Sequence, residues 1–334
     1  MQIGVLGAGT WGVALARMLH NDGKKVVVWS ALENEVENLS KSRVHPNLLG
    51  MKIPKGIEFT TDIKKACSGK TIILFAVPSV FLRDTVKKAA PYINDGQIIV
   101  DVAKGIESDT MLTMSGVILD QLKALDDKKS VKVVALSGPT HAEEVALDMP
   151  TTIVSACEDL KVAKTVQDIF MNENFRVYTN SDILGVELAG SLKNIIALAS
   201  GMASGLGYGD NARAALITRG AKEIADLGKA MGANEKTFSG LSGVGDLIVT
   251  ATSVHSRNNR AGMLMGKGVS CAEAIKLVGM VVEGVNAVPA AKKLAEKYKV
   301  ELPIVNAVDA VIKGNLDPKD AVRDLMTRDK KAEF

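Results

Sequence analysis

The feature that most constrains the fold is a glycine-rich turn between a strand and a helix at the start of the chain. Residues 2–6 (QIGVL) form a short apolar strand, GAGTWG follows at 7–12, and residues 13–23 (VALARMLHNDG) read as a helix closed by glycine. A second apolar run follows at 25–29. A strand, GxGxxG, a helix and a strand in this order are the context of the dinucleotide-binding fingerprint. We therefore predict that a βαβ unit opens a parallel sheet.

The three glycines of the turn have separate roles in such a unit. Gly7 permits the tight turn, Gly9 lets backbone amides approach a pyrophosphate, and Gly12 lets the helix pack on the strand. The start of the helix adds N–H donors and a favourable dipole for the phosphates. The alternative is a glycine-rich turn without a ligand, and the strand–turn–helix setting argues against it. These glycines are therefore expected to bind NAD or NADP.

The end of the second strand bears on the choice between the two cofactors. An acidic residue there favours NAD, and a nearby arginine favours NADP. Ser30 occupies the tip, Glu33 comes later, and no arginine is adjacent. Glu33 is explained equally well as the exposed start of a helix, so the sequence leaves the choice between NAD and NADP open.

The rest of the first half alternates between apolar strands and helical runs. Strands are predicted within the segments 71–77, 97–105, 131–144, 151–156 and 175–179. This alternation indicates a parallel, doubly wound, Rossmann-like sheet, whose ligand lies across the carboxyl ends of the strands. Three loops are expected at those ends: Pro78-Ser79, Lys104-Gly105 and residues 137–140. Lys104 is well placed there for an anion, or it is an exposed loop lysine.

From about residue 183 the strand pattern stops and helical periodicity continues to the end. With 334 residues, two domains are expected. The predicted fold class is α/β, with a dinucleotide-binding domain at 1–182 and an all-α substrate domain at 183–334. Helices are predicted at 184–203, 211–231, 258–266, 271–278, 284–298, 304–313 and 318–326. Residues 201–209 (GMASGLGYG) hold four glycines and are predicted to form a loop.

One lysine lies in the middle of the most apolar predicted helix. Lys193 shares a small, apolar helix face with residues such as Ala189 and Ile196, and no carboxylate lies three or four residues away. Such a lysine either extends along its stem to water or stays inside and loses basicity. The buried case provides an amine that shuttles a proton near neutral pH. The helix by itself favours the exposed case, because buried lysines are rare.

Two polar clusters follow in the helical half. Residues 241–246 (LSGVGD) are glycine-rich and end in an acid, and residues 256–260 (SRNNR) open a helix. Arginine with serine and asparagine at a helix start can bind phosphate through its forked donors and the helix dipole. The alternative for SRNNR is an N-cap followed by exposed arginines. Residues 281–284 (VVEG) are uninformative by themselves.

Several function classes are excluded by composition. A net charge of +3 without a basic block argues against a nucleic-acid partner. Three distant cysteines and no HExxH pattern predict neither a disulfide framework nor a metal site. No signal peptide and no uncharged run of membrane-spanning length are visible. We therefore expect a cytoplasmic protein without stable membrane insertion.

Several blocks in order resemble one enzyme family. They are GAGTWG at 7–12, HPNLL to IP at 45–54, AKG at 103–105, SGPTHAEE at 137–144, GSLKN at 190–194, GDNARAALITRG at 209–220, GVGDLIVT at 243–250, SRNNR at 256–260 and VVEG at 281–284. Over nearly its whole length the chain resembles the NAD(P)-dependent glycerol-3-phosphate dehydrogenases of the bacterial type. The resemblance implies hydride transfer between NAD(P)(H) and a small phosphorylated three-carbon substrate. Sn-glycerol 3-phosphate and dihydroxyacetone phosphate are interconverted, which supplies phospholipid synthesis.

The resemblance also implies roles for residues. Lys193 is the implied acid/base, with Asp246 and Lys104 as the other catalytic residues. The implied substrate-binding residues are Lys104, Gly138, Thr140, Lys193, Asp246, Thr250, Ser256, Arg257 and Asn258. Besides the glycines, the implied cofactor-binding residues are Thr10, Trp11, Lys104, Ala142, Arg257, Val281 and Glu283. The chain departs from the family pattern at two places. His141 stands where the family usually has an aromatic residue, and the strand tip Ser30-Ala31 lacks the basic residue that many NADP-preferring members carry.

Two other functions remain open from the sequence. A 2-hydroxyacid or ketopantoate-type reductase has a similar domain order and also uses a helix lysine; turnover of dihydroxyacetone phosphate against 2-keto acids separates the two. A catalytically silent NAD(P)H sensor is the other, and the presence of Lys193, Asp246 and Arg257 together argues against it. The sequence leaves the oligomeric state open, with a homodimer through the helical domain as the guess.

Overall fold

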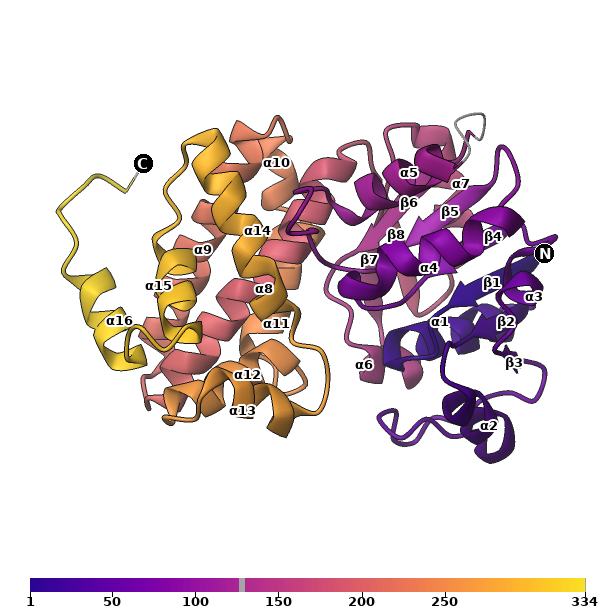
Figure 1. Ribbon diagram of the computed structural model, residues 1–334, viewed down its shortest axis with the longest axis horizontal. Coiled ribbons are helices and arrows are strands. Elements are labelled where there is room, and N and C mark those ends of the chain that lie inside the picture. The colour runs from indigo at the N-terminus through magenta and orange to yellow at the C-terminus, as the bar shows by residue number, and fades with distance from the viewer. Residues whose placement is uncertain (126–129, 334) are drawn as a thin grey trace. The chain divides into compact units, whose positions relative to one another are not determined.

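The computed structural model describes residues 1–125 and 130–333, which form two compact units. Unit 1 comprises Met1–Glu107 and Leu112–Glu187, and unit 2 comprises Ser108–Met111 and Leu188–Phe334. The division after Glu187 falls inside one long helix, α8 (Ile183–Gly205). Figure 1 labels the helices and strands of both units.

Unit 1 contains an eight-stranded sheet in the order β3-β2-β1-β4-β5-β6-β7-β8. The strands are β1 (Gln2–Leu6), β2 (Lys25–Trp29), β3 (Glu58–Thr60), β4 (Ile72–Phe75), β5 (Ile98–Asp101), β6 (Lys132–Ser137), β7 (Thr151–Ala156) and β8 (Phe175–Asn180). All pairs from β3 across to β6 are parallel. The predicted α/β fold class is confirmed. The three-residue strand β3 at the edge was not predicted, since its sequence is too short to show a pattern.

The last two strands run against the others. β7 pairs antiparallel with β6 and parallel with β8, so the prediction of a wholly parallel sheet is wrong at this end. The connection from β6 to β7 contains one helix, α6 (Ala142–Ala146), of five residues. Such a helix is about 7 Å long, whereas a six-residue strand spans about 20 Å. The helix therefore does not return the chain along β6, and β7 starts near the edge where β6 ends.

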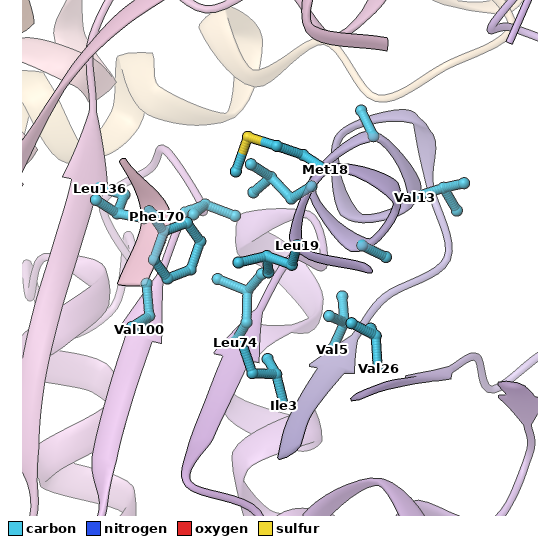
Figure 2. Packing of buried hydrophobic residues seen from close by; sticks show 14 of the residues in the cluster. Ile3, Val5, Val13, Met18, Leu19, Val26, Leu74, Val100, Leu136 and Phe170 are labelled. Atoms are coloured by element: carbon cyan, nitrogen blue, oxygen red, sulfur yellow. The ribbon is translucent and has the colours of Figure 1, made fainter. Parts of the chain in front are cut away.

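Helices cover both faces of the sheet. Alternate strand residues point to opposite faces, so Ile3 and Val5 lie in one hydrophobic cluster and Leu6 in the other. The first cluster includes residues of α1 and α7, and Figure 2 shows Met18 and Leu19 of α1 packed near the strands. The second cluster includes residues of α3, α4 and α5. These helices are α1 (Thr10–Asn21), α3 (Ile63–Cys67), α4 (Leu82–Ala89), α5 (Met114–Leu125) and α7 (Leu160–Phe170).

Among the residues that the structure describes, the regular elements of unit 2 are helices. Its helices after α8 are α9 (Asp210–Ala230), α10 (Glu235–Phe238), α11 (Asp246–Thr252), α12 (Arg257–Gly266), α13 (Cys271–Val278), α14 (Glu283–Tyr298), α15 (Pro303–Ile312) and α16 (Pro318–Met326). The seven predicted helices agree with these bounds to within a residue or two. The short helices α10 and α11, and a π-helical turn at Leu241–Gly245 between them, were not predicted.

The central helix α8 is long and apolar enough to cross a membrane, with a mean hydropathy of 1.4 over its most apolar window. However, 89% of that window is buried inside the protein, which is typical of the core helix of a soluble domain. The predicted loop at 201–209 is wrong in its first half, because α8 continues to Gly205. A Cβ on Gly201 would lie 2.1 Å from the Asn259 carbonyl oxygen of α12, so glycine here permits close helix packing. That tertiary contact outweighs glycine's weak helix propensity.

Candidate active site

The glycine-rich turn of unit 1 connects β1 to α1. Gly7 has φ +126°, which glycine adopts readily, and its N–H donates to the Trp29 carbonyl at 2.9 Å, which ties the turn to the end of β2. A Cβ on Gly12 would lie 2.1 Å from the Gly7 carbonyl oxygen, so α1 starts directly against the turn. Gly9 precedes the helix, and no side chain caps the α1 N-terminus.

This turn fits a dinucleotide. A Cβ on Gly9 would have no heavy atom within 4 Å, so packing within the protein does not require glycine there. Space beside backbone N–H groups at an uncapped helix N-terminus suits a pyrophosphate, which needs close backbone approach and benefits from the helix dipole. Thr10 and Trp11, predicted to bind the cofactor, are half-buried in the first turn of α1. Ala142, at the start of α6, packs with Trp11 against the same hydrophobic cluster.

The predicted loops at the carboxyl end of the sheet lie together. Lys104 Nζ donates to the Gly138 carbonyl at 3.2 Å, and Thr140 Oγ1 donates to the same oxygen at 3.1 Å. A Cβ on Gly105 would lie 2.4 Å from the Ser79 Cβ, so the loop after β4 touches the loop after β5. The structure thus brings Lys104, Gly138 and Thr140 into one cluster. Its cation and hydroxyl group are of the kind that bind anions.

A buried pair of acids under this edge was missed by the sequence analysis. Asp101 ends β5 and accepts a hydrogen bond from the Ala103 N–H at 3.2 Å, at the start of the loop that carries Lys104. Burial, and secondarily the charge of Glu187, raise the pKa of Asp101 well above its usual value. Burial also raises the pKa of Glu187, which accepts hydrogen bonds from the Ser115 N–H at 2.7 Å and Oγ at 2.5 Å. The only sequence signal was an acid ending an apolar strand.

The predicted lysine of α8 is buried in unit 2. Lys193 is 5% exposed, so its side chain does not extend to water. Its Nζ donates to Asp246 Oδ1 at 2.6 Å and to Thr250 Oγ1 at 2.5 Å. Asp246 and Thr250 lie one turn apart on α11, and both are buried. A buried ammonium bonded to a carboxylate and a hydroxyl is a chemically suitable proton donor and acceptor.

The SRNNR segment begins α12. Ser256 is its N-cap, and its Oγ accepts from the Asn259 N–H at 3.2 Å. Asn258 is engaged on both sides of its amide: Nδ2 donates to Asn194 Oδ1 at 3.0 Å, and Oδ1 accepts from the Gly284 N–H at 2.8 Å. These bonds join α12 to α8 and α14. Arg257, the first residue of α12, is half-buried.

The predicted residues are divided between the two units. Unit 1 holds Gly7, Gly9, Thr10, Trp11, Gly12, Lys104, Gly138, Thr140 and Ala142. Unit 2 holds Lys193, Asp246, Thr250, Ser256, Arg257, Asn258, Val281 and Glu283. In unit 2, Glu283 is the first residue of α14, and a Cβ on the adjacent Gly284 would lie 2.5 Å from the Asn194 carbonyl oxygen. The start of α14 is therefore next to the residue that follows Lys193.

A third acid without a signal in the sequence is Glu35, in the first turn of α2 (Glu33–Ser42). Its carboxylate accepts a hydrogen bond from the hydroxyl of Ser30, at the tip of β2. Ser30 is buried and Glu35 is half-buried. Glu33, the acid that the sequence offers for this place, is exposed. The spacing from Ser30 to Glu35 gave no signal, because the chain between them turns from strand to helix.

A sheet with a glycine-rich turn that fits a dinucleotide, and a helical unit with a buried lysine bonded to a carboxylate, together define an NAD(P)-dependent oxidoreductase. Family models narrow this class. Residues 2–163 match the N-terminal domain of NAD-dependent glycerol-3-phosphate dehydrogenase, and residues 182–323 match its C-terminal domain. The chain belongs to the NAD-dependent glycerol-3-phosphate dehydrogenase family.

Relatives agree with this assignment. The chain is 65% identical to "Glycerol-3-phosphate dehydrogenase [NAD(P)+] 2" of Lactobacillus delbrueckii, over 100% of this chain and 99% of the relative. It is 51% identical to "Glycerol-3-phosphate dehydrogenase [NAD(P)+]" of Agathobacter rectalis, over 99% and 97%. The crystal structure of glycerol-3-phosphate dehydrogenase from Coxiella burnetii matches with 36% identity and a TM-score of 0.93, over 98% of this chain and 99% of that one.

Proposed function

We propose that the chain interconverts sn-glycerol 3-phosphate and dihydroxyacetone phosphate with NAD(P)(H), and that Lys193 is its acid/base. The observation that carries the proposal is the buried Lys193 ammonium, 2.6 Å from Asp246 Oδ1 and 2.5 Å from Thr250 Oγ1. Membership of the dehydrogenase family supports the same reaction. Glycerol 3-phosphate made in this way supplies phospholipid synthesis.

The residues of the chain then have separate tasks in the reaction. When bound, the nicotinamide supplies a hydride to C2 of the substrate or accepts one from it. Lys193 Nζ gives a proton to the C2 oxygen during reduction and takes it back during oxidation. Its positive charge also stabilises the negative charge that develops on that oxygen. Asp246 and Thr250 hold the ammonium group in place.

The cofactor is assigned to the glycine-rich turn and its neighbours. Gly7, Gly9 and Gly12, with Thr10 and Trp11, take the pyrophosphate at the start of α1. The further cofactor residues that we propose are Lys104, Ala142, Arg257, Val281 and Glu283. Lys104, Gly138 and Thr140, which share one carbonyl oxygen, are also proposed to contact substrate.

The substrate phosphate is assigned to the start of α12. Arg257 supplies a forked cation there, and the helix N-terminus adds a favourable dipole. Ser256 and Asn258, also proposed to contact substrate, have capping and helix-joining bonds that keep this site in shape. Binding the phosphate fixes the reacting carbon without taking part in the chemistry.

The test compares dihydroxyacetone phosphate with unphosphorylated dihydroxyacetone, followed by the loss of reduced nicotinamide absorbance. We expect turnover on the phosphorylated substrate and little on the other. Arg257→Ala should lower kcat/KM for dihydroxyacetone phosphate by roughly 30-fold or more, mainly through KM, since it removes a charge-assisted contact. Arg260→Ala is the matched control, because Arg260 lies on the same helix and is exposed.

Other outcomes would contradict the proposal. Faster turnover of 2-keto acids than of dihydroxyacetone phosphate would indicate a reductase of carboxylate substrates. Binding of reduced cofactor without turnover of any carbonyl compound would indicate a sensor. Equal effects of Arg257→Ala and Arg260→Ala would remove the phosphate site from the start of α12.

We also propose the location, partners and oligomeric state of the enzyme. The small phosphorylated substrate and the burial of α8 support a protein that works in the cytoplasm without stable membrane insertion. The modest net charge of +3 supports the view that it has no nucleic-acid partner. A homodimer through the helical unit is the oligomeric state to test, for example by light scattering.

A further inference from the structure

The tip of β2 carries a fixed carboxylate. The Ser30 N–H donates to the Thr60 carbonyl at 3.1 Å, and Ser30 Oγ accepts from the Leu32 N–H at 3.1 Å. With its Oγ anchored in this way, the Ser30 hydroxyl donates to the Glu35 carboxylate. The residue before Ser30 is Trp29, whose carbonyl accepts from the Gly7 N–H of the glycine-rich turn. The carboxylate is therefore held at the same edge of the sheet as that turn.

Lys41 in the last turn of α2 and Arg43 just after it are engaged elsewhere. Lys41 forms an ion pair with Glu37 on the exposed side of α2. Arg43 donates to the Ile57 carbonyl at 2.7 Å, and its guanidinium lies over the Phe59 ring, 5.7 Å from the centroid. These contacts direct both cations to partners other than the carboxylate at the tip.

One titratable side chain does interact electrostatically with Glu35. His45 is 5% exposed, and burial lowers the pKa of its imidazole despite the nearby charges of Glu35 and Glu143. The imidazole is therefore neutral at neutral pH and does not offset the negative charge of the tip. The electrostatic character of this place is set by the carboxylate.

This arrangement bears on which dinucleotide is accepted. In a sheet of this kind, the residue at the end of the second strand meets the adenosine ribose. A ribose 2′-hydroxyl donates readily to a carboxylate, whereas a 2′-phosphate brings like charge against it, which is costly. We propose that Glu35, held by Ser30, is the specificity-determining residue and that it selects NAD(H) over NADP(H). The proposal rests on the nucleotide site of the proposed function.

The test measures binding, so it does not depend on turnover. Wild-type protein, Glu35→Gln and Glu33→Gln are titrated with NADH and with NADPH in the absence of substrate, by calorimetry. Wild type is expected to bind NADH at least roughly tenfold more tightly than NADPH. Glu35→Gln should lower that ratio by about tenfold, chiefly by tightening NADPH binding. Glu33→Gln removes the same charge from the same helical turn, where Glu33 is exposed, and should leave the ratio unchanged.

The outcomes separate this proposal from the one on which it rests. Binding of both dinucleotides with a ratio that Glu35→Gln does not change would overturn the role of Glu35 and leave the nucleotide site intact. If Glu33→Gln changes the ratio of the two affinities and Glu35→Gln does not, selectivity belongs to Glu33 and the proposal is overturned. Binding of neither dinucleotide would overturn both the proposal and the nucleotide site.

Discussion

At the scale of single residues, burial gives Lys193 its chemical character. A lysine on an apolar helix usually reaches water along its stem, yet Lys193 is 5% exposed. Its partner Asp246 is further buried, at 1% exposure, and lies 53 residues away in the sequence. Removing one partner of a buried pair leaves the other charge uncompensated and typically costs about 3–5 kcal/mol. Loss of either Lys193 or Asp246 should therefore lower stability as well as activity.

We predict that Lys193→Met separates chemistry from binding. Methionine fills much of the same volume without a charge, so the proton donor is lost while the space that the side chain occupies stays filled. The variant should be less stable than wild type, because Asp246 loses its cation. We expect kcat to fall by roughly a thousandfold or more, since both acid/base catalysis and oxyanion stabilisation are removed. The Kd for reduced cofactor should change little. Steady-state kinetics and cofactor titration check this, and near-normal turnover would rule out Lys193 as the acid/base.

At the scale of elements, the crossing of α8 and α12 depends on glycines from both helices. A Cβ on Gly201 of α8 would lie 2.1 Å from the Asn259 carbonyl oxygen, and one on Gly262 of α12 would lie 2.0 Å from the Leu198 carbonyl oxygen. Gly205 and Gly266 make similar approaches one turn further along. The two backbones are therefore nearly in contact. This crossing also sets the distance between Lys193 on α8 and the start of α12.

We predict that Gly262→Ala destabilises the protein, contrary to helix propensity. In an exposed helix this change would stabilise by about 0.5–1 kcal/mol. Here the added methyl group meets backbone atoms of α8 that cannot rotate away, and overpacking of this kind costs about 1–3 kcal/mol. Because α12 would move with respect to α8, KM for the phosphorylated substrate should rise as well. Urea unfolding gives the sign of the stability change, and a more stable variant would contradict the packing argument.

At the scale of the whole molecule, the buried acid Glu223 should make the stability of the protein depend on pH. Glu223 on α9 accepts a hydrogen bond from the Ile304 N–H of α15 at 2.8 Å. Burial raises the pKa of Glu223 to about 7 from its usual 4.5, even though this bond, Arg219 and Arg328 act in the opposite direction. The folded protein thus binds a proton on Glu223 at pH values where the unfolded chain has lost it. The resulting stability is full below about pH 4.5 and is lost as the pH rises towards about 7.

We predict that Glu223→Gln flattens this part of the stability profile. The difference between the free energies of unfolding, wild type minus variant, should increase by up to about 3 kcal/mol as the pH is lowered from about 8 to about 5. Asp101 and Glu187 have raised pKa values of the same sign, but they are present in both proteins and cancel in the difference. Denaturant unfolding at the two pH values measures it. Glu235→Gln, at an exposed site, is the control, and parallel profiles for wild type and Glu223→Gln would refute the assignment.

The sequence by itself determined what depends on neighbours along the chain. The glycine spacing after residues 2–6 predicted the turn between β1 and α1, and the apolar periodicity after residue 183 predicted the long helices of unit 2 to within a residue or two. Such patterns work because a helix or strand buries one face at a fixed period. The sequence also placed Lys193 on an apolar helix, and its resemblance to a known family named the reaction.

Only the tertiary structure decided what depends on contacts between distant segments. It turned β7 against β6, continued α8 through Gly201, buried Lys193 beside Asp246, and placed the Glu35 carboxylate at the tip of β2. None of these features has a local signal in the sequence. A glycine can end a helix or let two helices touch, and a lysine can be exposed or buried, and in each case the segments that pack against the residue decide. The chemistry of the site is therefore set by the packing of helices and strands that lie far apart in the sequence.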